Sequence, residues 1–397
     1  MLRALFELPR TVWLIGLISL VNDAASDMIY PLVPLYLASV LMSGPRVLGL
    51  IEGIAEATAS LLKLFSGVLV DRTRQTKPWI VFGYGLASIG RPLIAFVGSW
   101  PWLLALRFAD RVGKGLRTSP RDALLAASVP AERHGLAFGL HRAMDNAGAV
   151  VGPLVAAAML AGHLPLRDVF LWAALPAALC LALALALREP TAVSRPPAPA
   201  FDWRVRNLPP AFRRYLVVIA LFALGNSSNM FLLLRARQLG VSEATVPLLW
   251  AGVSAVAMIL STPLSALSDR VGRKRLLLGG YGVYAAFYLA LGLIGDSGLG
   301  LAALFALYGV FLAATEGVEK ALVADLAPQA RRGTAFGWFN LVVGIMLLPA
   351  SVLFGWLWQA TTPTAAFGFS AACALAAALL LAVWVFPDGA SRTSAAA

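Results

Sequence analysis

The sequence has few charged residues for its length. Asp, Glu, Lys and Arg make up 13% of its 397 residues and 59% are hydrophobic, whereas soluble globular chains carry roughly a quarter charged residues. The mean hydropathy is +0.79. This composition excludes an ordinary soluble domain and predicts that lipid surrounds most of the chain.

Cysteine and histidine are also scarce, with 2 and 3 residues. Cys180 and Cys373 each lie in an apolar segment, which predicts two free thiols. The histidines lack the spacing of metal ligands, and the sequence has no phosphate-binding loop of the Walker type. We therefore expect no enzymatic activity, no metal, no cofactor and no transport driven by ATP hydrolysis in this chain.

The net charge of +12 could suit a nucleic-acid partner if the bases formed a surface. They fall instead in short clusters between hydrophobic segments, which predicts membrane loops and no nucleic acid.

Twelve apolar stretches are long enough to cross about 30 Å of hydrocarbon, which takes roughly 20 helical residues. The first six are Thr11 to Val40, Val47 to Val70, Pro78 to Val97, Trp100 to Val129, Gly135 to Ala161 and Leu166 to Leu187. The last six are Tyr215 to Leu239, Val246 to Ser268, Leu276 to Ile294, Leu299 to Leu326, Gly333 to Gln359 and Ala365 to Phe386. The sequence therefore predicts an all-α membrane protein with twelve transmembrane helices.

Loop charge predicts the orientation, because Lys and Arg near helix ends stay on the cytoplasmic side. Basic clusters such as Arg204 to Arg214 and Arg270 to Arg275 fall on one side, and the opposite loops hold little beyond Arg46, Arg167 and Arg237. We expect a multi-pass protein of a bacterial-type inner membrane with both termini in the cytoplasm.

The longest polar interruption divides the chain in the middle. It predicts an N-terminal six-helix bundle at 1–187, a proline-rich cytoplasmic linker at 188–214 and a C-terminal six-helix bundle at 215–397. The halves repeat, since Asp71-Arg72 recurs as Asp269-Arg270, 269 − 71 = 198 positions later, and Gly135 recurs as Gly333 at the same offset. Transporters built from parallel repeats hold their substrate near the midplane, where the halves meet.

At these motifs the chain resembles the major facilitator superfamily, over nearly its whole length. Gly67-Val-Leu-Val-Asp71-Arg72 is similar to the family signature G-x-x-x-D-R-x-G-R-[RK], with Arg74 in place of the second glycine, and the second copy has Ser265 at the first glycine. The resemblance implies two bundles related by a pseudo-twofold axis that rock to give alternating access. Gly67, Asp71, Arg72, Asp269 and Arg270 are then expected in a conformational gate, the alternative being plain positive-inside anchors.

Ionisable residues inside the predicted spans are the main functional candidates, because a charge in hydrocarbon costs several kcal/mol unless it has a partner or water. Asp23 and Asp27 share a face of the first span, and Glu52 and Glu56 share a face of the second. The fourth carries Arg111 and a basic stripe of Lys114, Arg117 and Arg121, followed by Asp122. If the first, second and fourth spans adjoin, as the resemblance implies, the acids neutralise the bases. Exchange of partners could then carry protons, the alternative being a static ion-pair lattice.

The fifth span contains Arg142 and Asp145, which can pair locally at their three-residue spacing. It continues through Gly148, Gly152 and Pro153, which resemble the G-x-x-x-G-P motif of the superfamily's antiporters. The alternative is ordinary close packing of membrane helices.

The second half is poorer in charge. Asn226 and Asn229 lie in the seventh span, and Glu316, Glu319 and Lys320 lie in the tenth. By the 198-residue offset, Arg121 and Asp122 correspond to Glu319 and Lys320 with the signs exchanged, so cross-axis pairs could close a cytoplasmic gate. Separate pairs within each helix are the alternative.

Together these features predict a secondary transporter that works as a monomer and exports a small organic compound in exchange for protons, with the proton gradient as its energy source. Its expected partners are the substrate, protons and membrane lipids. One alternative is a proton-linked symporter that imports an anionic nutrient through the basic stripe. Others are a lipid flippase and a membrane sensor that transports nothing.

Overall fold

The computed structural model describes residues 7–73, 75–130, 134–188, 204–295, 298–328 and 331–385, and in these ranges it has helices and no strand. The first half comprises α2 (Arg10–Ile29) with η1 (Tyr30–Leu32) and α3 (Val33–Ser39), α4 (Pro45–Thr73), α5 (Lys77–Leu93) with η2 (Ile94–Phe96), α6 (Trp100–Ala127), α7 (His134–Ala161), and α8 (Leu166–Trp172) with α9 (Ala174–Leu185).

The second half begins with the short η4 (Val205–Asn207). It continues with α10 (Pro210–Gly225) and α11 (Met230–Gln238), α12 (Val246–Val271), α13 (Arg273–Leu293), α14 (Gly298–Leu326), α15 (Arg332–Ala360), and α16 (Pro363–Leu380) with η6 (Leu381–Val385). Taken with their short continuations, these helices form the six spans predicted for each half, so the predicted fold class is confirmed.

Hydropathy alone finds fewer spans. Within the described residues, nine helices are long and apolar enough to cross a membrane. The exceptions include α4 and α6, which carry more charged residues than the other helices of the first half. Two of the helices that hydropathy misses therefore carry candidates such as Glu52, Glu56 and Lys114, whereas α2, which carries Asp23 and Asp27, is among the nine.

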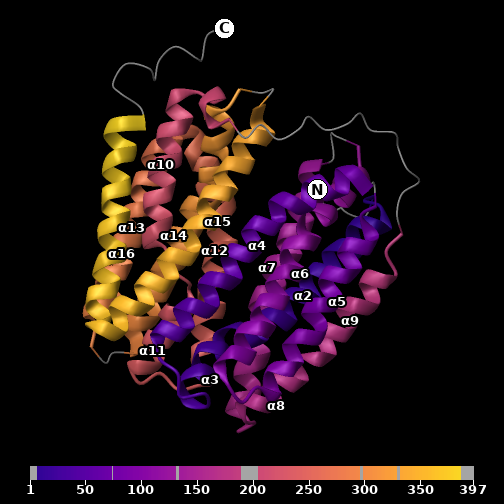
Figure 1. Ribbon diagram of the computed structural model, residues 1–397, viewed down its shortest axis with the longest axis vertical. Helices are drawn as coiled ribbons and strands as arrows, with labels where there is room; N and C mark the ends of the chain where they lie inside the picture. The colour runs from indigo at the N-terminus through magenta and orange to yellow at the C-terminus, as the bar shows by residue number, and fades with distance from the viewer. Residues whose placement is uncertain are drawn as a thin grey trace.

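The helices of the two halves lie on opposite sides of the molecule, with α4 and α15 near the boundary between them (Figure 1). Contacts between the halves join α4 with α15, α7 with α12, and α3 with α11. The segments α3 and α11 lie at the end of the molecule opposite the start of α2 and the end of α16 (Figure 1). The halves are therefore packed together at the end away from the chain termini.

Small residues let α4 and α15 approach closely along what we call the α4–α15 seam. Its contacts are Gly355 with the carbonyl of Pro45, Gly49 with the carbonyl of Ser351, Gly53 with Leu348, and Gly344 with Ser60. At Gly355, Gly49 and Gly344 a Cβ would overlap atoms of the other half, and at Gly53 it would be in tight contact with Leu348. Such small-residue contacts are typical of close helix pairs in membranes.

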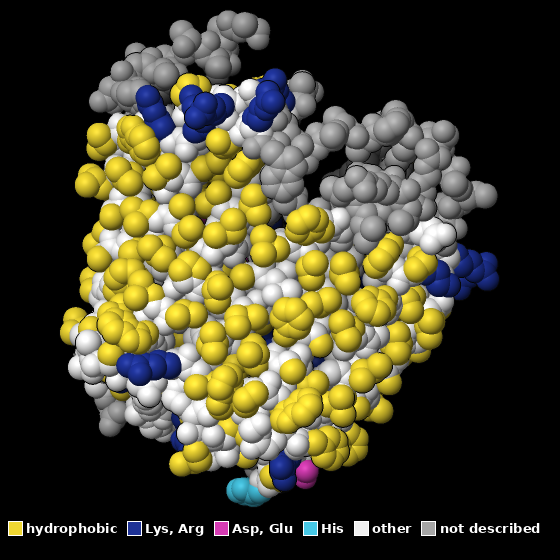
Figure 2. Space-filling model, in the orientation of Figure 1, with side chains coloured by type: hydrophobic (Ala, Val, Ile, Leu, Met, Phe, Trp, Pro, Cys, Tyr) yellow, Lys and Arg dark blue, Asp and Glu magenta, His cyan; other side chains and the backbone are white. Residues whose placement is uncertain are grey.

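The surface of the described residues fits a lipid environment. Hydrophobic side chains cover most of the face in Figure 2, and Lys and Arg gather toward its ends and edges. Large apolar side chains such as Ile89, Phe96, Leu293 and Leu379 are each more than 60% exposed. This apolar surface agrees with a multi-pass membrane protein.

The interiors of the halves differ in chemistry. The second half is filled with buried aromatic side chains, in which Phe222 stacks on Tyr281 and Tyr284 stacks on Tyr288, each pair with ring centroids 4.1 Å apart. The first half instead buries ionisable side chains such as Glu52, Arg91 and Arg107. The buried charges that a functional site could use therefore lie mainly in the first half.

Candidate functional site

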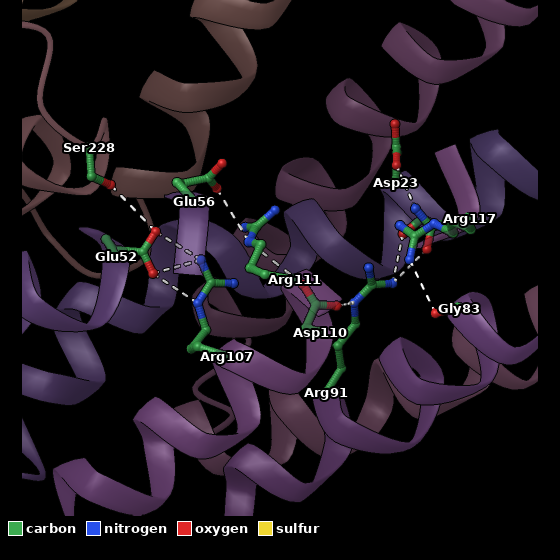
Figure 3. Close-up of polar contacts among 11 residues, drawn as sticks. Asp23, Glu52, Glu56, Gly83, Arg91, Arg107, Asp110, Arg111, Arg117 and Ser228 are labelled. Atoms are coloured by element: carbon green, nitrogen blue, oxygen red, sulfur yellow. Dashed lines mark hydrogen bonds and ion pairs between the residues drawn. The ribbon is translucent and has the colours of Figure 1, made fainter. Parts of the chain in front are cut away.

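Two ion pairs join α4 to α6. The guanidinium of Arg107 makes a forked contact with the Glu52 carboxylate, with Nη2 at 2.7 Å from Oε1 and Nε at 2.9 Å from the same oxygen (Figure 3). The Glu52 side chain is fully buried and that of Arg107 is 6% exposed. One turn further, Arg111 Nε lies 3.3 Å from Glu56 Oε1, and Glu56 is partly exposed. The prediction that acids of the second span neutralise bases of the fourth is thus realised in these two pairs.

A third buried group of charges centres on Arg91 of α5. Its Nε donates to Asp110 Oδ1 at 3.1 Å, and its Nη1 donates to both the carbonyl and the side-chain oxygen of Asn22, each at 3.0 Å. Asn22 Nδ2 in turn donates to Asp23 Oδ1 at 2.7 Å. Figure 3 shows Asp23 of α2, Arg91 of α5 and Asp110 of α6 in this group. Sequence reasoning missed Arg91, because its partners lie on other helices.

The three members of the basic stripe of α6 have different surroundings, which bears on the alternative that they bind an anion together. The Arg117 guanidinium lies 4.4 Å from the ring centre of Tyr84 and its Nη1 donates to the Gly83 carbonyl. Arg121 pairs with Asp122 at 2.9 Å and also donates to Ser19. Lys114 is partly exposed and makes no side-chain ion pair with any described residue. Lys114 is the member of the stripe left open to a ligand.

Asp23 and Asp27 have no basic partner at ion-pair distance in the described ranges. Asp23 accepts a hydrogen bond from Asn22, and Asp27 takes part in no hydrogen bond with a described residue. Both side chains are partly exposed. They differ in this from Glu52, Glu56 and Asp110, whose charges are already matched by arginines.

An ion pair connects the two halves. Arg142 of α7 donates to Glu316 of α14 at 3.0 Å and lies 3.6 Å from Asp145 on its own helix. Behind Asp145, the His141 ring is hydrogen-bonded to Ser19 of α2 at 2.8 Å. The predicted local pair of Arg142 and Asp145 is present, and Glu316 extends it to the other half.

The ion pair between Arg142 and Glu316 is exposed although it joins the two halves. The side chains of Arg142 and Glu316 are 58% and 52% exposed although they touch one another across the two halves. Groups on facing helices of different halves are exposed to the space between them, and charges there require water rather than acyl chains. Arg142 and Glu316 are therefore expected to face water between the halves, whereas Glu52, Arg91, Arg107 and Asp110 are buried against one another in ion pairs.

The predicted cross-axis pairs are absent from this structure. Arg121 contacts Asp122 next to it, and Glu319 accepts a hydrogen bond from Tyr281 at 3.0 Å. Lys320 is exposed. The local pair of Arg121 and Asp122 is therefore present, whereas Glu319 is bonded to α13 and not to Lys320, and pairing across the axis stays a prediction.

The structure describes the side chains of only part of the repeated signature. The side chains of Gly67, Asp71, Arg72 and Asp269 lie outside the described residues, and Arg270 is exposed. In the second copy, Arg273 donates to Ser268 at 2.6 Å and to Asp325 at 3.0 Å, which ties α13 to the ends of α12 and α14. Gly272 has φ +95°, which an L side chain rarely adopts, so glycine suits this turn.

The glycine motif of α7 packs inside the first half. Gly148 lies against the backbone of Leu20 and Ala24, and Gly152 lies against that of Ala24 and Met28. Pro153 follows inside a continuous helix. The motif therefore brings α7 against α2 beside Asp23, and the alternative of close helix packing describes what is seen.

The seventh span is broken, whereas the sequence predicted one helix from Tyr215 to Leu239. Asn226, Ser227 and Ser228 are not helical, and they separate α10 from α11. Ser228 Oγ donates to Glu52 of the other half at 3.4 Å. Asn229 accepts a hydrogen bond from Tyr308 at 2.5 Å, and Asn226 is partly exposed. Such a break leaves backbone N–H and C=O groups without helical hydrogen bonds, which is tolerated inside a membrane where protein or water supplies the partners.

Known proteins share both the sequence pattern and the fold. The family model for the Major Facilitator Superfamily matches residues 15–235 and 215–396. The chain is 34% identical over 382 residues to an uncharacterized MFS-type transporter of Methanocaldococcus jannaschii, covering 94% of this chain and 95% of that one. It is 26% identical over 341 residues to the multidrug resistance protein MdtH of Photorhabdus laumondii, covering 83% and 82%. A solved POT family transporter in complex with 5-aminolevulinic acid aligns over 95% and 96% with a TM-score of 0.78 at 13% identity, which shows the same fold.

Proposed function

Because this chain belongs to the major facilitator superfamily, a family of membrane transporters, we propose that it exports a small organic compound in exchange for protons. It works as a monomer in the plasma membrane, with both termini in the cytoplasm. The energy source is the proton gradient.

The observation that carries this proposal is the pair of acids without basic partners. A carboxylate paired with a buried arginine resists protonation, because the proton would leave the arginine charge unmatched. Asp23 and Asp27 have no such arginine and are partly exposed. They are therefore the acids best suited to bind and release protons during a transport cycle.

The contacts of the basic residues of α6 favour export over anion import. Arg117 and Arg121 already have partners, which leaves Lys114 as the one member of the basic stripe open to an anion among the described residues. Asp23 and Asp27 lie on the neighbouring α2 and disfavour an anionic ligand. The similarity to a multidrug resistance protein also supports export of small organic compounds.

Alternating access follows from the contacts between the halves. They are packed along the α4–α15 seam, and the side chains of Arg142 and Glu316, which join the halves, are more than half exposed. Separation along this seam would open the opposite side of the site. The proposed cycle links that movement to protonation of Asp23 and Asp27.

The direction of coupling is measured in vesicles that contain the purified protein. A panel of small organic cations and anions, with ethidium and benzoate as first probes, is offered under an imposed pH gradient. We expect a cationic probe to move against the protons and the exchange to fall at least about 10-fold in the Asp23→Asn, Asp27→Asn double variant, as when one essential charge is lost. Asp168→Asn, in the first turn of α8, is the matched control and should exchange normally.

Co-movement of benzoate with protons would instead support the importer. Equal exchange by the double variant and the control would overturn the assignment of the proton to these two acids.

A further inference from the structure

We propose that Arg91 is a positioning residue for Asp23 and acts through Asn22. This inference rests on the proposed proton-carrying role of Asp23. Arg91, Asn22 and Asp110 are each at most 5% exposed, whereas Asp23 is partly exposed. The three buried residues thus form a support that ends at a carboxylate within reach of water.

Arg91 is fixed from one side by Asp110. Its Nε donates to Asp110 Oδ1 at 3.1 Å, which sets the plane of the guanidinium. Asp110 is held in turn, because its second oxygen lies 3.8 Å from Arg111 Nε. Arg91 Nη1 then reaches α2, where it donates to the backbone and side-chain oxygens of Asn22, both at 3.0 Å.

The chemistry of the guanidinium determines which way the Asn22 amide points. Arginine only donates hydrogen bonds, so the amide oxygen must face Arg91. The amide nitrogen then faces the opposite way, and it lies 2.7 Å from Asp23 Oδ1. The orientation of the Asn22 donor is therefore set by its neighbour on α5.

This donor holds the Asp23 carboxylate in place and favours its ionised form. Arg91 itself does not contact Asp23, because its guanidinium donates to the neighbouring Asn22 and Asn22 donates to the Asp23 carboxylate. A direct arginine pair would oppose protonation far more strongly. The arrangement suits an acid that must stay ordered in both protonation states.

Other ionisable groups also act on Asp23 from every helix packed against it. They are Asp27 on α2, Tyr84 on α5, Lys114 on α6, Asp145 on α7 and Cys180 on α9. Among the described residues none of these lies within hydrogen-bond distance of Asp23, so Asn22 is its direct contact.

The test follows the Asp23 carboxyl group itself and needs no substrate. Infrared difference spectra of the purified full-length protein in lipid are recorded as the pH is changed, and the carbonyl band of a protonated acid that Asp23→Asn removes is assigned to Asp23. In Asn22→Asp the donor becomes a second carboxylate while Arg91 keeps an acceptor. We expect this variant to move the midpoint of the band by about one pH unit toward higher pH, because a like charge replaces the donor.

Arg91→Lys should move the midpoint in the same direction and shift the band frequency, since an ammonium cannot reproduce the planar fork that holds Asn22 and Asp110. Ser88→Ala is the matched control on the same helix. It removes a buried hydrogen bond to the Ala177 carbonyl and should leave the band of Asp23 unchanged.

The two proposals fail in different ways. If Asp23→Asn removes no titrating band, Asp23 does not take up a proton, and both its role in transport and the inference about Arg91 are wrong. If the Asp23 band is present but neither Asn22→Asp nor Arg91→Lys changes it more than Ser88→Ala does, the inference about Arg91 is overturned while the proton-carrying role stands.

Discussion

Replacing Glu52 with alanine should lower the free energy of unfolding by about 3–5 kcal/mol, the cost of leaving one partner of a buried ion pair unmatched. Arg107 would keep its charge at 6% exposure without the carboxylate that now receives its forked contact. The variant would also lose the hydrogen bond from Ser228 of the other half. The loss is read as a fall of roughly 5 °C or more in the melting temperature of the purified protein.

Two further variants show whether the buried charge is the cause. Glu243→Ala breaks an ion pair with Arg237 whose side chains are 35% and 42% exposed, and it should cost no more than about 1 kcal/mol. Combining Glu52→Gln with Arg107→Met removes both charges and should recover most of the stability lost in Glu52→Ala. A Glu52→Ala protein as stable as Glu243→Ala would show that the pair contributes little.

Alanine at Gly49 should oppose the packing of the two halves and therefore reduce transport. The expected reduction is about 5-fold to 150-fold, because overpacking one of the two states of the cycle costs about 1–3 kcal/mol. The added Cβ would overlap the Ser351 carbonyl of α15, and backbone cannot move aside as a flexible side chain can. The measurement is the exchange of the responding probe in vesicles.

Gly282→Ala provides the comparison, because a Cβ at this position of α13 meets nothing within 4 Å. It should transport at the normal rate. Equal activity of the Gly49→Ala and Gly282→Ala proteins would mean that close contact along the α4–α15 seam is not needed in the cycle.

The spans could be predicted because length, hydropathy and loop charge are local properties of the sequence. The fourth span was predicted to begin at Trp100, where α6 begins. The seventh was placed too late, at Tyr215, because α10 begins at Pro210 among basic residues. Proline is tolerated in the first turn, where its missing N–H has no partner to lose. The predicted boundaries between the N-terminal bundle, the linker and the C-terminal bundle, at residues 187, 188 and 214, stay a prediction, because residues 189–203 lie outside the described part of the chain.

Partners of the charged groups could be predicted only in part, because they depend on which helix faces which. Spacing places Lys114, Arg117 and Arg121 on related faces of one helix. The structure gives them three different surroundings, since Arg117 meets Tyr84 of α5 and Arg121 meets Ser19 of α2. Sequence spacing contains no information about these neighbours.

Arg91 and the break after Gly225 show the same limit. A single arginine in α5 has no acid three or four residues away, so local rules give it no partner. The break at Asn226 has a local signal in Gly225, a residue common at helix ends. That signal is weak in a membrane span, because glycine is also frequent inside transmembrane helices.

The central claim is that protonation of Asp23 and Asp27 controls whether the halves are packed along the α4–α15 seam. The most direct measurement is the distance between spin labels at Arg46→Cys and Thr361→Cys, exposed positions in different halves, with Cys180 and Cys373 replaced by alanine. A label pair at Arg46→Cys and Arg167→Cys, both in the first half, is the internal control. We predict two distances between the halves whose populations change with pH, a single distance within the first half, and no pH response after Asp23→Asn and Asp27→Asn. One unchanging distance between the halves at every pH would contradict the account.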